Sequence, residues 1–160
     1  MTEMSQAVRD ALVKCELFRG LGDEDRARVF GLARACSFGD GAPIVREDEE
    51  AKELFLIVDG RADVQVRWPF KEGDSQQIGQ VRRGDVIGEV ALVDRCLRSA
   101  TVRAVGPVEA VAVPNDALRR LCEESPPLGY RVMENVARLL AGRMRETNLK
   151  LRNTIANLIY

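Results

Sequence analysis

The sequence predicts a mainly β protein with flanking helices: an antiparallel jelly roll, or double-stranded β-helix, between N-terminal helices and a long C-terminal helix. Three observations lead to this fold class. Short runs rich in β-branched residues follow one another between residues 42 and 113, turn residues separate them, and no crossover helix interrupts them. A doubly wound sheet would need helices between its strands, so we expect antiparallel pairing.

Two helices are expected before the strands. In residues 5–18 the apolar positions recur every three or four residues, which is helical periodicity. Asp23 can cap a second short helix that runs through Ala33. The turn at residues 39–41, Gly-Asp-Gly, then closes this helical part.

The strands are expected in six runs. Residues 62–67 alternate small or apolar side chains with polar ones, as a strand with one buried face does. Residues 71–75 are polar and are predicted to form a hairpin tip. The six expected strands are residues 43–46, 54–59, 62–68, 76–81, 99–105 and 108–113.

Helices return after the strands. Residues 114–116 begin a short helix, residues 125–127 (Ser-Pro-Pro) interrupt it, and a long helical pattern follows from about Leu128. Its apolar stripe, about 140° wide at 100° per residue, consists of Val132, Val136, Leu140, Met144, Thr147, Leu151, Ile155 and Leu158. The stripe runs further than a barrel end can cover, so we predict a parallel homodimer with its seam at Leu140, Met144, Leu151 and Ile155.

The composition excludes several classes of site. The 160 residues are 46% hydrophobic and 31% charged, with no His, so imidazole cannot serve as a base, a haem ligand or a zinc ligand. The four cysteines lie far apart, without a C-x-x-C pair. They are Cys15, Cys36, Cys96 and Cys122. We therefore expect no enzyme, no metal and no cofactor.

Charge and chain organisation predict one domain without a nucleic-acid or membrane partner. The net charge is −1, although residues 126–160 carry six basic against two acidic side chains. No apolar run resembles a signal peptide or a membrane span, which favours the cytoplasm. The expected organisation is a single domain over residues 1–160: N-terminal helices at 1–41, the jelly roll at 42–113 with a ligand loop at 84–102, and C-terminal helices at 114–160.

The segment 84–102 carries the chemistry. It places a small helix between two strands, with Gly88 allowing close backbone approach and Glu89 opening the helix. Arg98 follows nine residues after Glu89. A guanidinium beside free backbone N–H groups binds a phosphodiester, and a carboxylate in the same pocket accepts from a sugar hydroxyl. The ligand described in this way is a nucleotide with one phosphate charge.

At these residues the chain resembles the cyclic-nucleotide-binding domain family, which includes catabolite-activator proteins and protein-kinase regulatory subunits. The family's phosphate-binding cassette reads F-G-E-L-A-L, a short loop, and then R-[ATS]-A-[TS]-V. Here residues 87–92 read Ile-Gly-Glu-Val-Ala-Leu and residues 98–102 read Arg-Ser-Ala-Thr-Val. Upstream, the resemblance extends through residues 17–21, 47–49, 54–60 and 84–85. The chain departs from the pattern at Ile87, Asp48 and Leu97, where the family often has Phe, Gly and Pro, and none of these changes removes a ligand group.

The resemblance implies a ligand and a set of binding residues. Glu89 would accept from the ribose 2′-hydroxyl and Arg98 would hold the cyclic phosphate, while Ser99 favours cyclic AMP over cyclic GMP. The other implied ligand-binding residues are Gly88, Val90 and Ala91 in the cassette and Thr147 and Asn148 in the last helix. Those two polar residues could instead be a register device or a helix bend.

The leading interpretation is a non-catalytic cyclic-nucleotide receptor that signals through its C-terminal helix to an effector that the sequence does not name. One alternative is an interaction module that responds to a partner protein or a cyclic dinucleotide. Another is the truncated sensor domain of a transcription regulator, since the chain stops at Tyr160, before the helix-turn-helix of the catabolite-activator branch. A haem or redox sensor on the same scaffold would need the His or clustered cysteines that the chain lacks.

Overall fold

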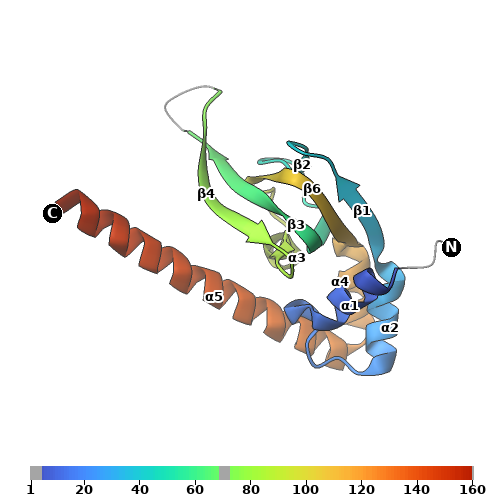
Figure 1. Ribbon diagram of the computed structural model, residues 1–160. Coiled ribbons are helices and arrows are strands. Elements are labelled where there is room, and N and C mark those ends of the chain that lie inside the picture. Colours follow the sequence, from blue (N-terminus) through green and yellow to red (C-terminus); the bar gives the residue numbers. More distant parts are fainter. Residues whose placement is uncertain (1–4, 69–72, 160) are drawn as a thin grey trace.

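The protein is a single antiparallel sheet covered at one end by helices (Figure 1). The computed structural model describes residues 5–68 and 73–159. Within them the strand order is β1-β6-β3-β4, with β2 on β6 and β5 on β3, and every pairing is antiparallel. The strands are β1 (Arg34–Phe38), β2 (Pro43–Val45), β3 (Glu53–Arg67), β4 (Ser75–Arg82), β5 (Val86–Ile87) and β6 (Thr101–Pro114). The predicted fold class is therefore confirmed.

Two long strands replace four of the expected short ones. β3 bends at Gly60 and β6 at Gly106, both with positive φ, and the register between the strands shifts there. At Gly60 a side chain would also collide with the carbonyl oxygen of Pro107, so the bend requires glycine. Each long strand thus supplies two straight segments, which is why each reads in the sequence as two strands. The hairpin tip predicted at residues 71–75 lies partly outside the described residues, and its last residue, Ser75, already belongs to β4.

The helices lie before, within and after the sheet. They are α1 (Gln6–Lys14), the 3₁₀ turn η1 (Glu16–Phe18), α2 (Asp23–Leu32), α3 (Glu89–Asp94), α4 (Asn115–Glu124) and α5 (Pro126–Ile159). The first predicted helix is shorter than residues 5–18, because its N-cap is Ser5 and its last turn gives way to η1. Gly22, and not Asp23, occupies the N-cap of α2.

The structure corrects the predicted start of the sheet. Residues 34–38 do not belong to the N-terminal helical part but form β1, which pairs with β6 from Arg34 opposite Ala112 to Phe38 opposite Val108. The half-buried Cys36 and Phe38 pack against the apolar cluster inside the sheet. Two such positions make too short an alternation to indicate a strand, and the pairing with β6 decides the conformation. The two-residue β5 is likewise too short to show an alternation, and its pairing with β3 decides its conformation.

Two apolar clusters hold the fold together. One lies among the helices and includes Leu12, Phe18, Leu118 and Val132. The other lies between the strands and includes Phe55, Ile57, Ile87 and Ala110. The β5–α3 segment joins them, because its Val86 and Leu92 belong to the helical cluster whereas Ile87 belongs to the other. The segment 84–102 is thereby packed against both apolar clusters.

The long helix α5 has a buried and an exposed half. Val132 and Val136 are buried against the helical cluster, whereas Met144 and Leu151 are exposed by more than half. In Figure 1 the C-terminal half of α5 extends away from the rest of the chain. Among the described helices, none is long and apolar enough to cross a bilayer.

Candidate functional site

The turn between β5 and α3 brings the predicted ligand loop together. Gly88 has φ +87°, in the left-handed region, and leads directly into α3. A Cβ at this position would overlap the guanidinium of Arg98 and approach the carbonyl oxygen of Glu53 to 3.2 Å. Gly88 is therefore required both by its backbone conformation and by the side chain that lies against it.

Glu89 is a fully buried carboxylate at the first position of α3. Its Oε1 accepts from Nη1 of Arg143 in α5, which also donates from Nη2 to the carbonyl oxygen of Val86. Its Oε2 is buried and has no hydrogen-bond partner among the described residues. One oxygen of this buried carboxylate is thus paired with α5, and the other has no hydrogen-bond partner among the described residues.

Arg98 is a nearly buried guanidinium, 8% exposed. Its Nη2 donates to the carbonyl oxygen of Glu53, and its Cζ lies 5.9 Å from the centroid of the Phe55 ring. Burial lowers the pKa of Arg98, while the nearby carboxylates of Glu53 and Glu89 act in the opposite direction. Its Nη1 is buried without a hydrogen-bond partner among the described residues.

The backbone around Arg98 is fixed as well. Its N–H donates to the carbonyl oxygen of Glu49, and its own carbonyl oxygen accepts from the N–H of Asp48. Asp48 has φ +65°, in the left-handed region that Asp adopts more readily than most residues. The loop after β2 thereby holds the segment that carries Arg98.

Glu89 and Arg98 offer complementary groups to a ligand. A buried carboxylate oxygen and a buried guanidinium nitrogen each lack a partner within the described chain. Leaving such a group unpaired costs about 1–3 kcal/mol. A molecule that presents a hydroxyl to Oε2 of Glu89 and an anionic oxygen to Nη1 of Arg98 would remove both costs.

The remaining predicted ligand-binding residues differ in burial and lie on α3, beside Arg98 or on α5. Ala91 is buried in α3, Val90 is 38% exposed on the same helix, and Ser99 is exposed beside Arg98. Thr147 and Asn148 are exposed on α5, and among the described residues no hydrogen bond or ion pair joins either one to the loop. The structure therefore brings Gly88, Glu89 and Arg98 together and places the polar pair about one turn of α5 beyond Arg143, which bonds to Glu89.

Arg143 is the residue that the sequence pattern did not single out. It comes four residues before Thr147, so the two lie on one side of α5, one turn apart. The sequence feature that could have identified Arg143 is its position, because it places a cation one helical turn from a candidate base-reading residue. The sequence does not show which carboxylate Arg143 pairs with, because that depends on how α5 packs against α3.

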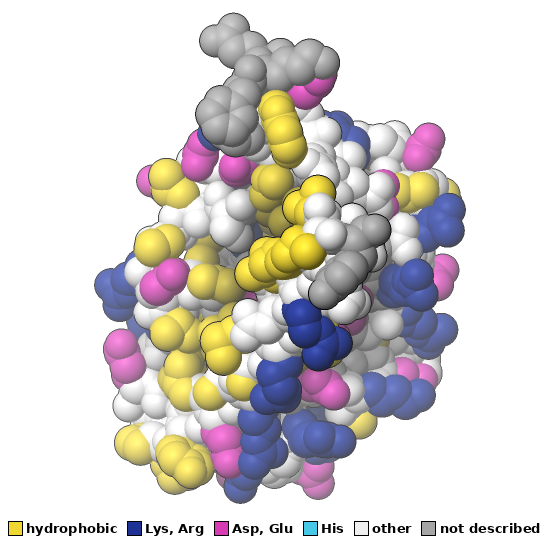
Figure 2. Space-filling model, turned by 90° about the vertical axis from the view of Figure 1, so that its left-hand side faces the viewer, with side chains coloured by type: hydrophobic (Ala, Val, Ile, Leu, Met, Phe, Trp, Pro, Cys, Tyr) yellow, Lys and Arg dark blue, Asp and Glu magenta, His cyan; other side chains and the backbone are white. Residues whose placement is uncertain are grey.

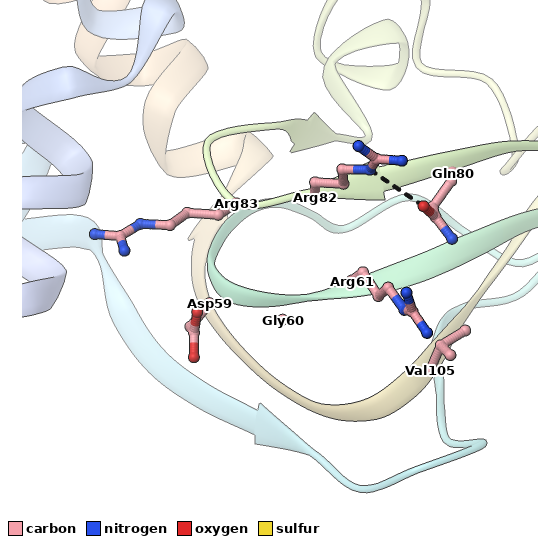
Figure 3. Close-up of a pocket in the computed structure, with 7 residues that line it drawn as sticks. All are labelled: Asp59, Gly60, Arg61, Gln80, Arg82, Arg83 and Val105. Atoms are coloured by element: carbon pink, nitrogen blue, oxygen red, sulfur yellow. Dashed lines mark hydrogen bonds between the residues drawn. The ribbon is translucent and has the colours of Figure 1, made fainter.

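A hollow also lies away from this loop. A shallow pocket of about 610 Å³ lies at the bend of β3 and β6, and its lining includes Arg61, Arg82 and Arg83. Figure 3 shows these guanidiniums pointing in different directions, with Arg83 turned away from the other two. They do not converge on a common ligand atom, so this pocket is a poorer candidate than the loop at Gly88. The described residues also contain no group of three or more Cys, Asp or Glu placed to hold a metal ion.

Comparison with known proteins agrees with this geometry. The model of the "Cyclic nucleotide-binding domain" family matches residues 35–125. A cAMP-dependent protein kinase regulatory subunit of Mycosarcoma maydis is 29% identical over 136 residues, which cover 85% of this chain and 24% of that protein. A CRP-like cAMP-activated global transcriptional regulator of Mycobacterium tuberculosis is 26% identical over 151 residues, 94% of this chain and 63% of that protein.

A solved structure shows the same fold. The cyclic nucleotide-binding domain from Methylobacillus flagellatus KT superposes with a TM-score of 0.79 at 25% identity, over 92% of this chain and 82% of that one. The two curated relatives are much longer: this chain spans about a quarter of the first and under two thirds of the second.

Proposed function

This chain belongs to the cyclic nucleotide-binding domain family, and from that premise we propose that it is a non-catalytic receptor that prefers cyclic AMP to cyclic GMP. One observation carries the proposal: Oε2 of Glu89 and Nη1 of Arg98 are buried, without partners in the described chain, in the same loop. A cyclic nucleotide carries a ribose hydroxyl and a singly charged phosphate, which are the groups that these two atoms lack.

Each residue of the loop then has a role. Arg98 pairs with the cyclic phosphate in a site from which water is largely excluded, where a charge-assisted hydrogen bond is strong. Glu89 accepts from the 2′-hydroxyl through Oε2 while Arg143 balances its charge at Oε1. Ser99, beside Arg98, supports the preference for cyclic AMP, and both curated relatives described above are named for cyclic AMP.

The pair of Glu89 and Arg143 gives a prediction by double-mutant cycle. We expect Arg143→Met to lower the free energy of unfolding by about 2 kcal/mol, because it leaves the buried Glu89 carboxylate without the charged donor at Oε1. Glu89→Gln should weaken cyclic AMP binding less than loss of Arg98 does, since the amide oxygen still accepts a hydrogen bond. The double variant should regain most of the stability lost in Arg143→Met. Denaturant titration measures the stability of the wild type and the three variants, and calorimetric titration measures the affinity of Glu89→Gln. Strictly additive effects on stability would contradict the coupling.

We further propose that α5 signals occupancy and forms a parallel homodimer. Figure 2 looks at the C-terminal end of α5 and shows hydrophobic side chains gathered beside a row of Lys and Arg. The exposed apolar side chains of this half are Met144, Leu149, Leu151, Ile155, Leu158 and Ile159. An apolar stripe of this length that no part of the described chain covers suits a second copy of the same helix. Because Arg143 ties α5 to Glu89, a ligand at Glu89 acts directly on the position of this helix.

The dimer is tested by one exposed substitution. We expect Leu151→Glu to make the protein monomeric at tens of micromolar, because it places a charge in the apolar seam. Lys150→Glu, next to it on the helix but off the apolar stripe, serves as the control and should leave the mass unchanged. Light scattering with and without cyclic AMP measures both. A monomeric wild-type protein under both conditions would refute the dimer.

Thr147 and Asn148 are proposed to contact the base, with a register role as the alternative. The variant with both residues changed to Ala separates the two roles. Base contact requires lower cyclic AMP affinity at unchanged mass, whereas a register role requires altered mass with the affinity per site retained.

The proposed unit is the whole of residues 1–160, because α1 and η1 pack into the same apolar cluster as α4 and α5. Four free thiols suit a reducing compartment, and we propose the cytoplasm. The experiment that tests the function is thermal unfolding with added nucleotide. Cyclic AMP at a concentration well above its dissociation constant should raise the midpoint of unfolding, and 5′-AMP should not, since its phosphate carries a different charge and lacks the ring. Equal effects of the two nucleotides would contradict a cyclic-nucleotide site.

A further inference from the structure

The helix that presents Gly88 and Glu89 is too short to hold its own position. α3 has six residues and is bounded by two residues in the left-handed region, Gly88 at φ +87° and Arg95 at φ +57°. Helices of this length are not stable by their own hydrogen bonds. The last four carbonyl groups of any helix also lack partners within it. The orientation of α3 must therefore come from neighbouring elements.

One side chain of α4 supplies partners at the C-terminal end of α3. Nη1 of Arg119 donates to the carbonyl oxygens of Ala91 at 3.0 Å and Leu92 at 3.2 Å, while its Nη2 donates to Oδ1 of Asp116 at 2.6 Å. The Arg119 side chain is only 16% exposed, whereas that of Asp116 is 81% exposed. A cation at the C-terminal end of a helix is also favoured by the helix dipole. Arg119 thus bonds to α3 from a sheltered position, whereas its bond to Asp116 lies at the surface.

Arginines therefore hold both ends of α3. Arg143 of α5 meets Glu89 at the first residue, and Arg119 of α4 meets the carbonyl groups of the last turn. Between them Leu92 packs into the helical cluster with Leu118, the residue before Arg119. A shift of α4 that moved Arg119 would remove the donor to the carbonyl oxygen of Leu92 and would leave that of Ala91 with the N–H of Arg95, at 3.2 Å, so the end of α3 would be held less firmly.

We propose that Arg119 is the positioning residue of the ligand loop: it fixes α3 to α4 in the orientation that presents Gly88 and Glu89 to the cyclic nucleotide. The inference rests on the function proposed above. Arg119 itself does not contact Glu89 or Arg98 in the structure, so its effect on binding acts through α3.

The test compares Arg119→Met with a matched arginine. Arg26 in α2 makes the same kinds of bond far from the loop, to the carbonyl oxygen of Leu21 at 3.0 Å and to Asp23 three residues earlier. Two quantities are measured on the full chain: the dissociation constant for cyclic AMP, and the hydrogen exchange of the amides of α3 without ligand. We expect Arg119→Met to weaken binding roughly tenfold, the loss that corresponds to a hydrogen bond from a charged group, and to speed exchange in α3. Arg26→Met should do neither.

Two further variants keep the outcome decisive. Asp116→Asn should retain wild-type affinity, because both bonds to α3 remain. Arg119→Lys, which keeps the charge but not the fork of donors, should lose less cyclic AMP affinity than Arg119→Met. It replaces Arg119→Met in the comparison if that variant does not fold. Unchanged affinity and exchange in Arg119→Met, an equal loss in Arg26→Met, or an equal loss in Asp116→Asn would overturn the proposal. If the wild-type protein does not bind cyclic AMP, the proposed function fails, and exchange in α3 alone decides whether Arg119 positions the helix.

Discussion

Arg98→Ala is expected to abolish cyclic AMP binding while the fold remains intact. The guanidinium is 8% exposed, and its Nη1 has no partner among the described residues. Removing one member of a desolvated charge pair costs on the order of 2–5 kcal/mol. The dissociation constant should therefore rise by about 30-fold to 4,000-fold, since each 1.4 kcal/mol corresponds to a factor of ten.

Stability should change much less than affinity. The substitution removes the hydrogen bond to the Glu53 carbonyl, but it also removes a buried charge whose Nη1 is unpaired. Calorimetric titration measures the affinity and thermal unfolding the stability. Arg61→Ala is the control, because Arg61 lies in β3 and lines the pocket away from the loop (Figure 3). An Arg98→Ala variant that binds cyclic AMP as tightly as the wild type would show that the phosphate binds elsewhere.

Gly88→Ala is expected to have the second largest effect on binding. The added methyl group would occupy the space of the Arg98 guanidinium, which would have to move away from the site. Because the end of a flexible side chain can move, the cost to the fold is mainly that of a positive φ at a non-glycine residue, about 1–2 kcal/mol. Because the displaced guanidinium no longer faces the phosphate, we expect the affinity for cyclic AMP to fall at least about tenfold, or about 1.4 kcal/mol.

Gly84→Ala provides the matched control. Gly84 has φ +92°, similar to the +87° of Gly88, but a Cβ there meets nothing within 4 Å. The two variants should lose similar stability in denaturant titration, and only Gly88→Ala should lose cyclic AMP affinity. If both variants lost affinity equally, backbone strain and not displacement of Arg98 would be responsible.

The sequence predicts the fold where its pattern is local. The alternation in β3, the turn residues between strands and the apolar stripe of α5 all lie in the segments that they describe. β1 and β5 escape this reasoning, because Arg34–Phe38 and Val86–Ile87 are strands only through their pairing with β6 and β3. The bends at Gly60 and Gly106 likewise depend on how two long strands pack, so each strand reads as two.

The candidate site likewise has one part that the sequence predicts and another that only the structure shows. Gly88, Glu89 and Arg98 lie within eleven residues of one another, and their spacing alone identifies the loop. Arg143 is 54 positions from Glu89 along the chain, and Arg119 is 28 positions from Ala91. Their partners depend on the directions in which α4 and α5 leave the sheet, which only the packed structure determines.

The central claim is that Glu89 and Arg98 form a site for one cyclic nucleotide per chain. Its most direct test is calorimetric titration of the wild-type protein with cyclic AMP, cyclic GMP and cyclic di-GMP. The predicted result is saturable binding of one cyclic AMP per chain, weaker binding of cyclic GMP and none of cyclic di-GMP. Absence of heat with both cyclic AMP and cyclic GMP, or tighter binding of cyclic di-GMP, would contradict the claim.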